Sequence, residues 1–222
     1  MRDTDNTAVS KKEKFALAKI REDIANFYNI TLTRHEAKRL DGLNVRIERV
    51  DYKVTKFFSF KDFESVDETL RAAILCRNKY YQEAGFPTFM TRSLVPDVTE
   101  CAISGTGWSG IRLRDKRDSR RNTSRKHVSF SCPIPETGKI TTKDISLQKH
   151  NDIIEQAVQH AVNVKRECVD IYNKVVPVYN DLASKSIEAA CLTEHRTLNP
   201  TLQYLKGNTQ RLWEQAYKMA VT

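Results

Sequence analysis

Residues 43–58 read LNVRIERVDYKVTKFF, and this stretch decides the fold class. Apolar side chains occupy every second position of residues 43–47, and the alternation resumes at residues 50–54 after a slip near Arg49. A period of two is typical of strands that bury one face. The slip predicts either two strands or one bulged strand, and the aromatic-rich residues 57–63 continue the strand region.

A helix is predicted directly after these strands. Ser65 and Glu68 have the spacing of a capping box, and apolar residues follow at helical spacing as far as Ala84. Gly85 lies where a glycine commonly ends a helix, and Pro87 follows it. The order from residue 43 onward is therefore strands and then a helix.

Before residue 41 the pattern favours helices. Apolar residues recur at three- to four-residue spacing between residues 15 and 27, which predicts a helix that begins at Lys11. Thr33 and Glu36 resemble another capping box, which predicts a short helix over residues 35–40 that ends at Asp41 and Gly42.

The second half of the chain repeats the order of strands and helix. Strands are predicted from Gly110, over residues 127–132 and over residues 139–147, with a turn rich in proline and glycine between the last two. A long helix should begin after Asn151 and end at Pro177. Two further helices are predicted over residues 181–192 and 209–221.

Three pairs of segments suggest an internal duplication. Residues 42–46 (GLNVR) match residues 110–114 (GIRLR), residues 58–60 match residues 145–147, and residues 67–77 match residues 155–165. The fold class is therefore predicted to be α+β, with two small three-stranded antiparallel sheet plus helix modules in tandem, flanked by N-terminal and C-terminal helices.

The predicted domain boundaries follow from this pattern. They comprise an N-terminal tail and helical segment at 1–40, a first sheet–helix module at 41–85, a linker at 86–107 that crosses the first module's surface, a second module with a basic insertion at 108–176, and a C-terminal helical region at 177–222. The last region is expected either to brace the modules or to form a homodimer, because it adds apolar residues that neither sheet needs.

Positive charge is concentrated in one part of the chain. The net charge is +9 and the pI is near 9.3, but eight cations and only two carboxylates lie between Arg112 and Lys126. Six of the nine net charges therefore fall in this run, which is typical of a surface that meets a polyanion.

The run SGIRLRDK at residues 109–116, with two strands and a helix after it, resembles the ethylene-response-factor (APETALA-type) DNA-binding domain. Similar modules occur in integrase arm-binding domains and in homing endonucleases of phages and mobile elements. FFSFKDFESVDETLRAAI at residues 57–74 resembles the same passage from sheet to helix. The resemblance implies that the sheet lies in the DNA major groove and that its arginines contact bases and phosphates. The family's tryptophan in the second strand is absent from both modules.

Twelve cations are predicted to bind nucleic acid. Those of the first module are Arg46, Arg49, Lys53 and Lys56, and those of the second are Arg112, Arg114, Lys116, Arg117, Arg120, Arg121, Arg125 and Lys126. Arg112 and Arg114 alternate along one strand and should face the same side, where they are expected to contact bases. The cations from Lys116 to Lys126 are expected to contact phosphates.

The chain contains two tryptophans. Trp108 is predicted to be a packing residue, with stacking on a base as the alternative. Trp213 is predicted to lie in the core or at an interface.

Other function classes find little support. The five cysteines form no C-x-x-C pair and the five histidines have no metal-binding spacing, so neither a disulfide framework nor a metal site is expected. The residues 105–110 are glycine-rich but lack the Lys-Ser/Thr of a phosphate-binding loop. No catalysis and no cofactor are predicted. No apolar stretch approaches the length of a membrane span and the N-terminus is polar, so a cytoplasmic location is expected, nucleoid-associated if the protein is encoded by a phage.

The sequence therefore predicts a double-stranded DNA-binding protein with sequence preference, most simply a transcriptional regulator of phage or mobile-element type. One alternative is the DNA-binding part of a homing-endonuclease or integrase lineage. Another is a phage structural or scaffolding protein whose basic run meets an acidic protein surface. An RNA binder is a third, although sheets that bind single-stranded RNA display aromatic residues rather than arginines.

Overall fold

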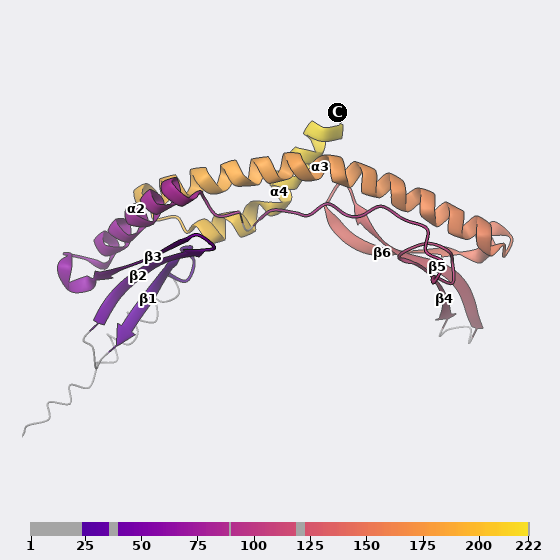
Figure 1. The fold of residues 1–222 in the computed structure, drawn as a ribbon, viewed down its shortest axis with the longest axis horizontal. Helices are drawn as coiled ribbons and strands as arrows, with labels where there is room; N and C mark the ends of the chain where they lie inside the picture. The colour runs from indigo at the N-terminus through magenta and orange to yellow at the C-terminus, as the bar shows by residue number, and fades with distance from the viewer. Residues whose placement is uncertain (1–23, 36–39, 89, 119–122, 222) are drawn as a thin grey trace, which may run out of the picture. The chain divides into compact units, whose positions relative to one another are not determined.

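The computed structural model describes residues 24–35, 40–88, 90–118 and 123–221 (Figure 1). The chain is α+β, with two three-stranded antiparallel sheets and long helices after each of them, so the predicted fold class is confirmed. It divides into two compact units. The first comprises residues 1–89 with 184–208, and the second comprises residues 90–183 with 209–222.

The sheet of the first unit is a meander of β1 (Ile30–His35), β2 (Leu40–Arg49) and β3 (Tyr52–Ser59), in that order. The slip near Arg49 is the turn between β2 and β3, so the alternative with two strands is confirmed. The alternating residues Leu43, Val45 and Ile47 are all buried and face the same side of the sheet.

Helix α2 (Val66–Ala84) covers that side, after a short 3-10 helix, η2 (Phe60–Asp62). The predicted cap is confirmed, since the Ser65 hydroxyl accepts a hydrogen bond from the Glu68 amide at 3.1 Å. Gly85 ends the helix with a φ of 85°, a conformation that residues with a Cβ rarely adopt. The helix side chains Leu70, Ala73 and Ile74 pack against the buried side chains of β2.

The start of the chain differs from the prediction. His35 is the last residue of β1 and Leu40 opens β2, so the ends of the predicted helix over residues 35–40 are strands. Residues 36–39 and most of the helix predicted from Lys11 lie outside the described residues. Residues Ile30–His35 form a strand despite the capping signal at Thr33, because they are rich in β-branched residues and pair along their whole length with β2.

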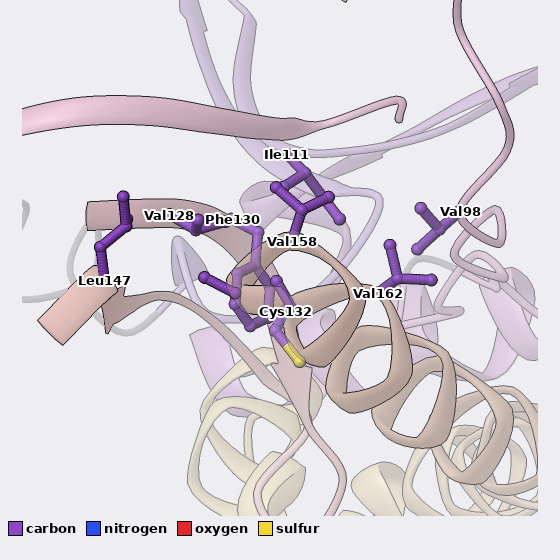
Figure 2. Packing of buried hydrophobic residues seen from close by; sticks show 10 residues of the cluster. Val98, Ile111, Val128, Phe130, Cys132, Leu147, Val158 and Val162 are labelled. Carbon is purple, nitrogen blue, oxygen red and sulfur yellow. The ribbon is translucent and has the colours of Figure 1, made fainter. Parts of the chain in front are cut away.

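The second unit repeats this order with β4 (Ile111–Asp118), β5 (Thr123–Ile134) and β6 (Lys139–Ser146), followed by η3 (Leu147–His150) and α3 (Ile154–Thr197). Residues 154–183 of α3 belong to this unit. The apolar residues between 154 and 168 pack across one face of the sheet, and Figure 2 shows Ile111, Phe130 and Val158 in the resulting core.

Helix α3 does not end at Pro177, so that prediction is wrong. Its apolar stripe continues through Val175, Val176 and Tyr179, all of them buried in a cluster with Trp213. Pro177 itself is exposed, which points its ring away from this cluster. Packing of the stripe on both sides of the proline outweighs the loss of one helix hydrogen bond.

Helix α4 (Thr201–Val221) begins earlier than the predicted start at residue 209. The predicted C-terminal region is not a separate body, because its helices are divided between the two units at residues 183–184 and 208–209. Ile187 and Leu205 are buried in the first unit, and Leu212 and Trp213 in the second. No helix in the described part of the chain is long and apolar enough to cross a membrane.

Much of the predicted linker over residues 86–107 belongs to the second unit. The Asn180 side chain bonds both the amide and the carbonyl of Arg92, at 2.7 and 3.0 Å. One helical heptad earlier, Asn173 bonds the amide and carbonyl of Val95 at 2.9 and 2.8 Å. These paired contacts hold the extended segment along α3.

The duplication is present in the element order but one of its sequence matches is out of step. Ala73 and Ile74 of α2 correspond to Ala161 and Val162 of α3, 88 residues later, and all four are fully buried. By contrast, residues 42–46 lie in the middle strand of their sheet, whereas residues 110–114 lead into and form the first strand of theirs. The match between residues 42–46 and 110–114 is therefore wrong, because the two segments lie in strands that are not equivalent.

The registers show which positions of the two sheets correspond. Leu32 pairs with Leu43 in the first sheet, and Leu113 pairs with Val128 in the second. Leu32 therefore corresponds to Leu113, and the neighbouring outward positions of β1 and β4 correspond as well. They are Thr31, Thr33 and His35 in the first sheet and Arg112, Arg114 and Lys116 in the second.

Candidate nucleic-acid interface

Helix α3 covers one face of the second sheet, so every second side chain of each strand points to the other side. We call this side the open face. Arg112, Arg114 and Lys116 of β4 lie on it, because Ile111 of the same strand points into the core. The register adds the residues paired with them and their outward neighbours, namely Arg125, His127, Ser129, Ser131, Thr142 and Asp144.

Two of these cations have no partner among the residues that the structure describes. Arg112 and Arg114 are exposed, and neither forms a hydrogen bond or ion pair with any residue that the structure describes. The ammonium group of Lys116 lies 3.3 Å from a carboxylate oxygen of Asp144, and Arg125 donates to Gln148 Oε1 at 3.2 Å. The prediction that Arg112 and Arg114 share one side is confirmed.

Asp144 moderates the positive charge of the open face. A hydrogen bond from the Ser129 hydroxyl lowers the pKa of this carboxyl, and Lys116 lowers it further, so the group stays ionised at neutral pH. Four cations, Arg112, Arg114, Lys116 and Arg125, share the face with this one carboxylate among the side chains described there. The face therefore keeps a net positive charge.

Strands β4 and β5 continue beyond the core as a two-stranded extension, formed by residues 115–118 and 123–126, which projects away from α3 (Figure 1). The side chains from Asp115 to Arg117 and from Ser124 to Lys126 are exposed. Arg117 and Lys126 point to the side opposite the open face, since they have the parity of Ile111 and Val128. The predicted cations Arg120 and Arg121 lie outside the described residues.

A hollow of about 200 Å³ lies beside Arg112 and Arg114. These arginines line it together with the hydroxyl residues Ser129, Ser131 and Thr142 and with Phe130. Gly110 and Lys165 also line it, and a Cβ added at Gly110 would lie 2.8 Å from the Lys165 ammonium. No carboxylate is among the residues that line it.

Lys165 is a site residue that the sequence analysis missed. It comes from α3, on the covered side of the sheet, and reaches the hollow past the start of β4. The available signal was the repeat match, which aligns Lys165 with Arg77 of α2. Nothing in the sequence indicates that the Lys165 side chain lies beside Gly110 and lines the same hollow as Arg112 and Arg114.

The four cations predicted in the first unit do not form a comparable surface. Arg46 and Lys53 share the uncovered face of the first sheet, but both pair with Glu48, at 2.6 and 3.1 Å. These two contacts lower the pKa of Glu48, that of Lys53 most.

The other two cations lie elsewhere. Lys56 is paired with Val45, which places it on the helix-covered face, and its ammonium is 5.5 Å from the Phe58 ring centroid. Arg49 donates hydrogen bonds to the carbonyls of Ala84 and Gly85 at the end of α2. A guanidinium at this position satisfies carbonyls that the helix leaves open.

Both tryptophans are packing residues. Trp108 is partly buried against the core of the second unit, with the Arg166 guanidinium 5.0 Å from its ring centroid. Trp213 is fully buried, and its indole N–H donates to the Pro135 carbonyl at 2.7 Å. Packing, the favoured prediction for each, is confirmed.

The chemistry of the open face is that of anion binding. Guanidinium and ammonium groups and hydroxyls donate hydrogen bonds, and phosphate oxygens accept them. The five cysteines are free thiols, and no group of three or more metal-ligating side chains is found among the described residues. The chain matched no protein-family model, and no match was found among curated proteins or solved structures.

Proposed function

We propose that the protein binds double-stranded DNA through the open face of its second sheet, with sequence preference, as a non-catalytic transcriptional regulator of phage or mobile-element type. The observation that carries the proposal is the pair Arg112 and Arg114, exposed on one face and without a partner in the described part of the chain. A cytoplasmic location, where the chain meets duplex DNA, is part of the proposal.

The dimensions of the strand suit a duplex. Alternate residues of a strand are about 6.8 Å apart, which equals about two steps of 3.4 Å along one DNA strand. Arg112, Arg114 and Lys116 therefore span about four base pairs if the strand follows the groove. The extension of β4 and β5 is a two-stranded ribbon, a shape that the major groove accommodates.

The residue types suit a division between bases and phosphates. An arginine fork can bond O6 and N7 of guanine together, which supports base contacts by Arg112 and Arg114. Cations on the exposed extension, among them Arg117, Arg125 and Lys126, are suited to phosphates on either side of the groove. The aromatic residue of β5, Phe130, is buried under α3, which favours a duplex over single-stranded RNA stacked on rings.

The proposal is tested by selecting duplexes from a random pool and then titrating a selected duplex by fluorescence anisotropy at 50 and 200 mM salt. A regulator should enrich a sequence and bind it at least about a thousandfold more tightly than unrelated DNA. Affinity should also fall steeply with salt, because phosphate contacts release counterions. Failure to enrich any sequence, with weak binding to all duplexes, would contradict the proposal and favour an acidic protein partner.

Assembly is a separate part of the proposal. A homodimer would suit a DNA site with two-fold symmetry. Light scattering of the protein alone and with a selected duplex measures this directly. A strict monomer in both samples would remove the dimer and leave the DNA-binding proposal intact.

A further inference from the structure

We infer that the hollow beside Arg112 is a discrete subsite for one phosphate group, held jointly by the strand arginines and by Lys165 of helix α3. The inference rests on the proposed function for the source of the phosphate, a phosphodiester of bound duplex. The same chemistry could also accept a free phosphate or a nucleotide, and the experiment below separates these sources.

The lining of the hollow matches a tetrahedral anion. Three cationic residues, Arg112, Arg114 and Lys165, line about 200 Å³ together with the hydroxyl residues Ser131 and Thr142. Ser129 also belongs to the lining, but its hydroxyl already donates to Asp144. A phosphate presents oxygens that accept several hydrogen bonds at once, and bonds to such ionised acceptors are short and strong. The ionised carboxylate of Asp144, which accepts a hydrogen bond from Ser129, is not among the residues that line the hollow.

The cations are available for such a ligand. Arg112, Arg114 and Lys165 form no hydrogen bond or ion pair with any residue in the described ranges. Lys165 is partly buried and has no carboxylate partner among the described residues. An anion in the hollow would pair with all three cations.

The backbone at the start of β4 makes room for Lys165. Gly110 has a φ of 68°, and its missing side chain leaves the space that the lysine ammonium occupies. A cation from the covered side of the sheet therefore reaches a hollow lined by open-face residues. Because the ligand would join α3 to β4 and β5, it would contact both layers of the unit.

The residue that corresponds to Lys165 in the first unit, Arg77, differs from it in burial and ion pairing. Arg77 of α2 is fully buried and bonds the carboxylate of Glu194. The second unit has no such internal acid at Lys165 among its described residues. A repeated helix position thus carries an internal ion pair in one unit and, in the other, a cation with no ion-pair partner in the described part of the chain.

The test compares Lys165→Gln with Lys174→Gln, which removes the same charge from an exposed lysine of the same helix that pairs with Asp170. Anisotropy titrations with a panel of duplexes, each carrying one neutral methylphosphonate, locate individual phosphate contacts. Wild-type protein and the Lys174 variant should lose about tenfold in affinity at one particular phosphate. The Lys165 variant should bind all duplexes about tenfold more weakly and lose its sensitivity at that phosphate.

Two additional measurements separate the outcomes. The log–log salt slope of Lys165→Gln should fall by about 0.9 relative to wild type, as expected for one lost phosphate contact. Inorganic phosphate and adenosine monophosphate, tested by thermal shift, reveal a small-molecule source if they stabilise wild type but not Lys165→Gln. That outcome supports the subsite even if no duplex binds. If Lys165→Gln matches wild type with duplex, phosphate and nucleotide alike, the subsite is wrong, while the contribution of Arg112 to DNA binding stands or falls on its own variant.

Discussion

The two sheets share a strand order, a covering helix and buried positions, yet their uncovered faces differ. At corresponding places the first sheet has Thr31, Thr33 and His35, and the second has Arg112, Arg114 and Lys116. The cations that the first sheet does carry on this side, Arg46 and Lys53, both pair with Glu48, which leaves these three residues with one net positive charge. Similar scaffolds therefore present different surfaces, and the proposed polyanion contact is expected in the second unit.

The same contrast runs through the helices. Arg77 is held in the core by the Tyr28 carbonyl, by Asn78 and by Glu194. Glu194 in turn accepts a hydrogen bond from the Thr201 amide. This network joins α2 to residues near the end of α3 and the start of α4 inside the first unit. Its role is structural, whereas Lys165 at the corresponding position of α3 forms no hydrogen bond or ion pair with any residue in the described ranges.

The largest effect is expected on the free energy of unfolding. It should differ between substitutions at Arg77 of α2 and at Lys165 of α3. Arg77→Met leaves the Glu194 carboxylate buried without its cation, which should lower the free energy of unfolding by about 3–5 kcal/mol. Lys165→Met, its counterpart, should change it by less than about 0.5 kcal/mol. Urea denaturation followed by circular dichroism measures both variants. Equal losses would show that the two positions have the same role.

Tryptophan fluorescence sharpens that experiment. Trp108 and Trp213 both belong to the second unit, so their emission reports on its packing. In the Arg77→Met variant, the circular dichroism signal should change at a lower urea concentration than the tryptophan fluorescence. Coincident shifts would indicate that the units unfold together.

The next effect concerns the uncovered faces. Replacing Arg112 or Arg114 by alanine should cost about 1–3 kcal/mol of binding free energy and reduce the preference for a selected duplex. The double variant Arg46→Ala, Lys53→Ala removes two cations from the first sheet, and it should change affinity by less than about 1 kcal/mol because both already pair with Glu48. Anisotropy with selected and unrelated duplexes measures both. A larger loss from the first-sheet variant would reverse the assignment.

The extension should contribute affinity without specificity. Neutralising Arg117 and Lys126 to glutamine removes two exposed cations that point away from the open face. Selected and unrelated duplexes should then weaken by similar factors, and the log–log salt slope should fall by about 1.8, or about 0.9 for each contact. A loss confined to the selected duplex would instead place base contacts on the extension.

The smallest effect comes from the carboxylates. Asp144→Asn removes an ionised group from the open face, since hydrogen bonding and Lys116 keep its pKa below the usual value. Duplex affinity should rise about two- to fourfold at low salt, and less at high salt, because the gain is electrostatic. Glu48→Gln frees Arg46 and Lys53 on the first sheet and should leave specific binding unchanged. Salt-dependent anisotropy distinguishes the two variants.

Local patterns in the sequence predict much of the fold. The alternation at residues 43–58 identifies β2 and β3, and the spacing of Ser65 and Glu68 identifies the start of α2. These signals succeed because the forces behind them act between neighbouring residues or set which face is buried. The parity rule also places Arg112 and Arg114 together on one side.

The failures have tertiary causes. Strand β1 is stabilised by pairing with β2, which a short capping signal at Thr33 cannot reveal. Packing on both sides of Pro177 carries α3 past a residue that usually ends helices. The match between residues 42–46 and 110–114 fails because a period of two fits any strand, and only the register tells a first strand from a middle one.

The sequence predicted only part of the site, because the ion-pair partners of its cations depend on the tertiary fold. Charge density located the basic run, but ion pairing decides which cations are available, and the partners Glu48 and Asp144 come from positions fixed by the fold. Arg49 has the parity of the buried residues and ends at the carbonyls of α2. Lys165 belongs to another layer of the structure, so no strand pattern could include it.

The central claim is that the open face of the second sheet is the surface that meets duplex DNA. Backbone amide chemical shifts of isotope-labelled protein, recorded while a selected duplex is added, test it most directly. We expect the largest changes in β4 and β5, at Arg112, Arg114, Ser129 and Ser131, and small changes in β1–β3. Changes concentrated in the first sheet, or spread along the helices with β4 and β5 unaffected, would contradict it.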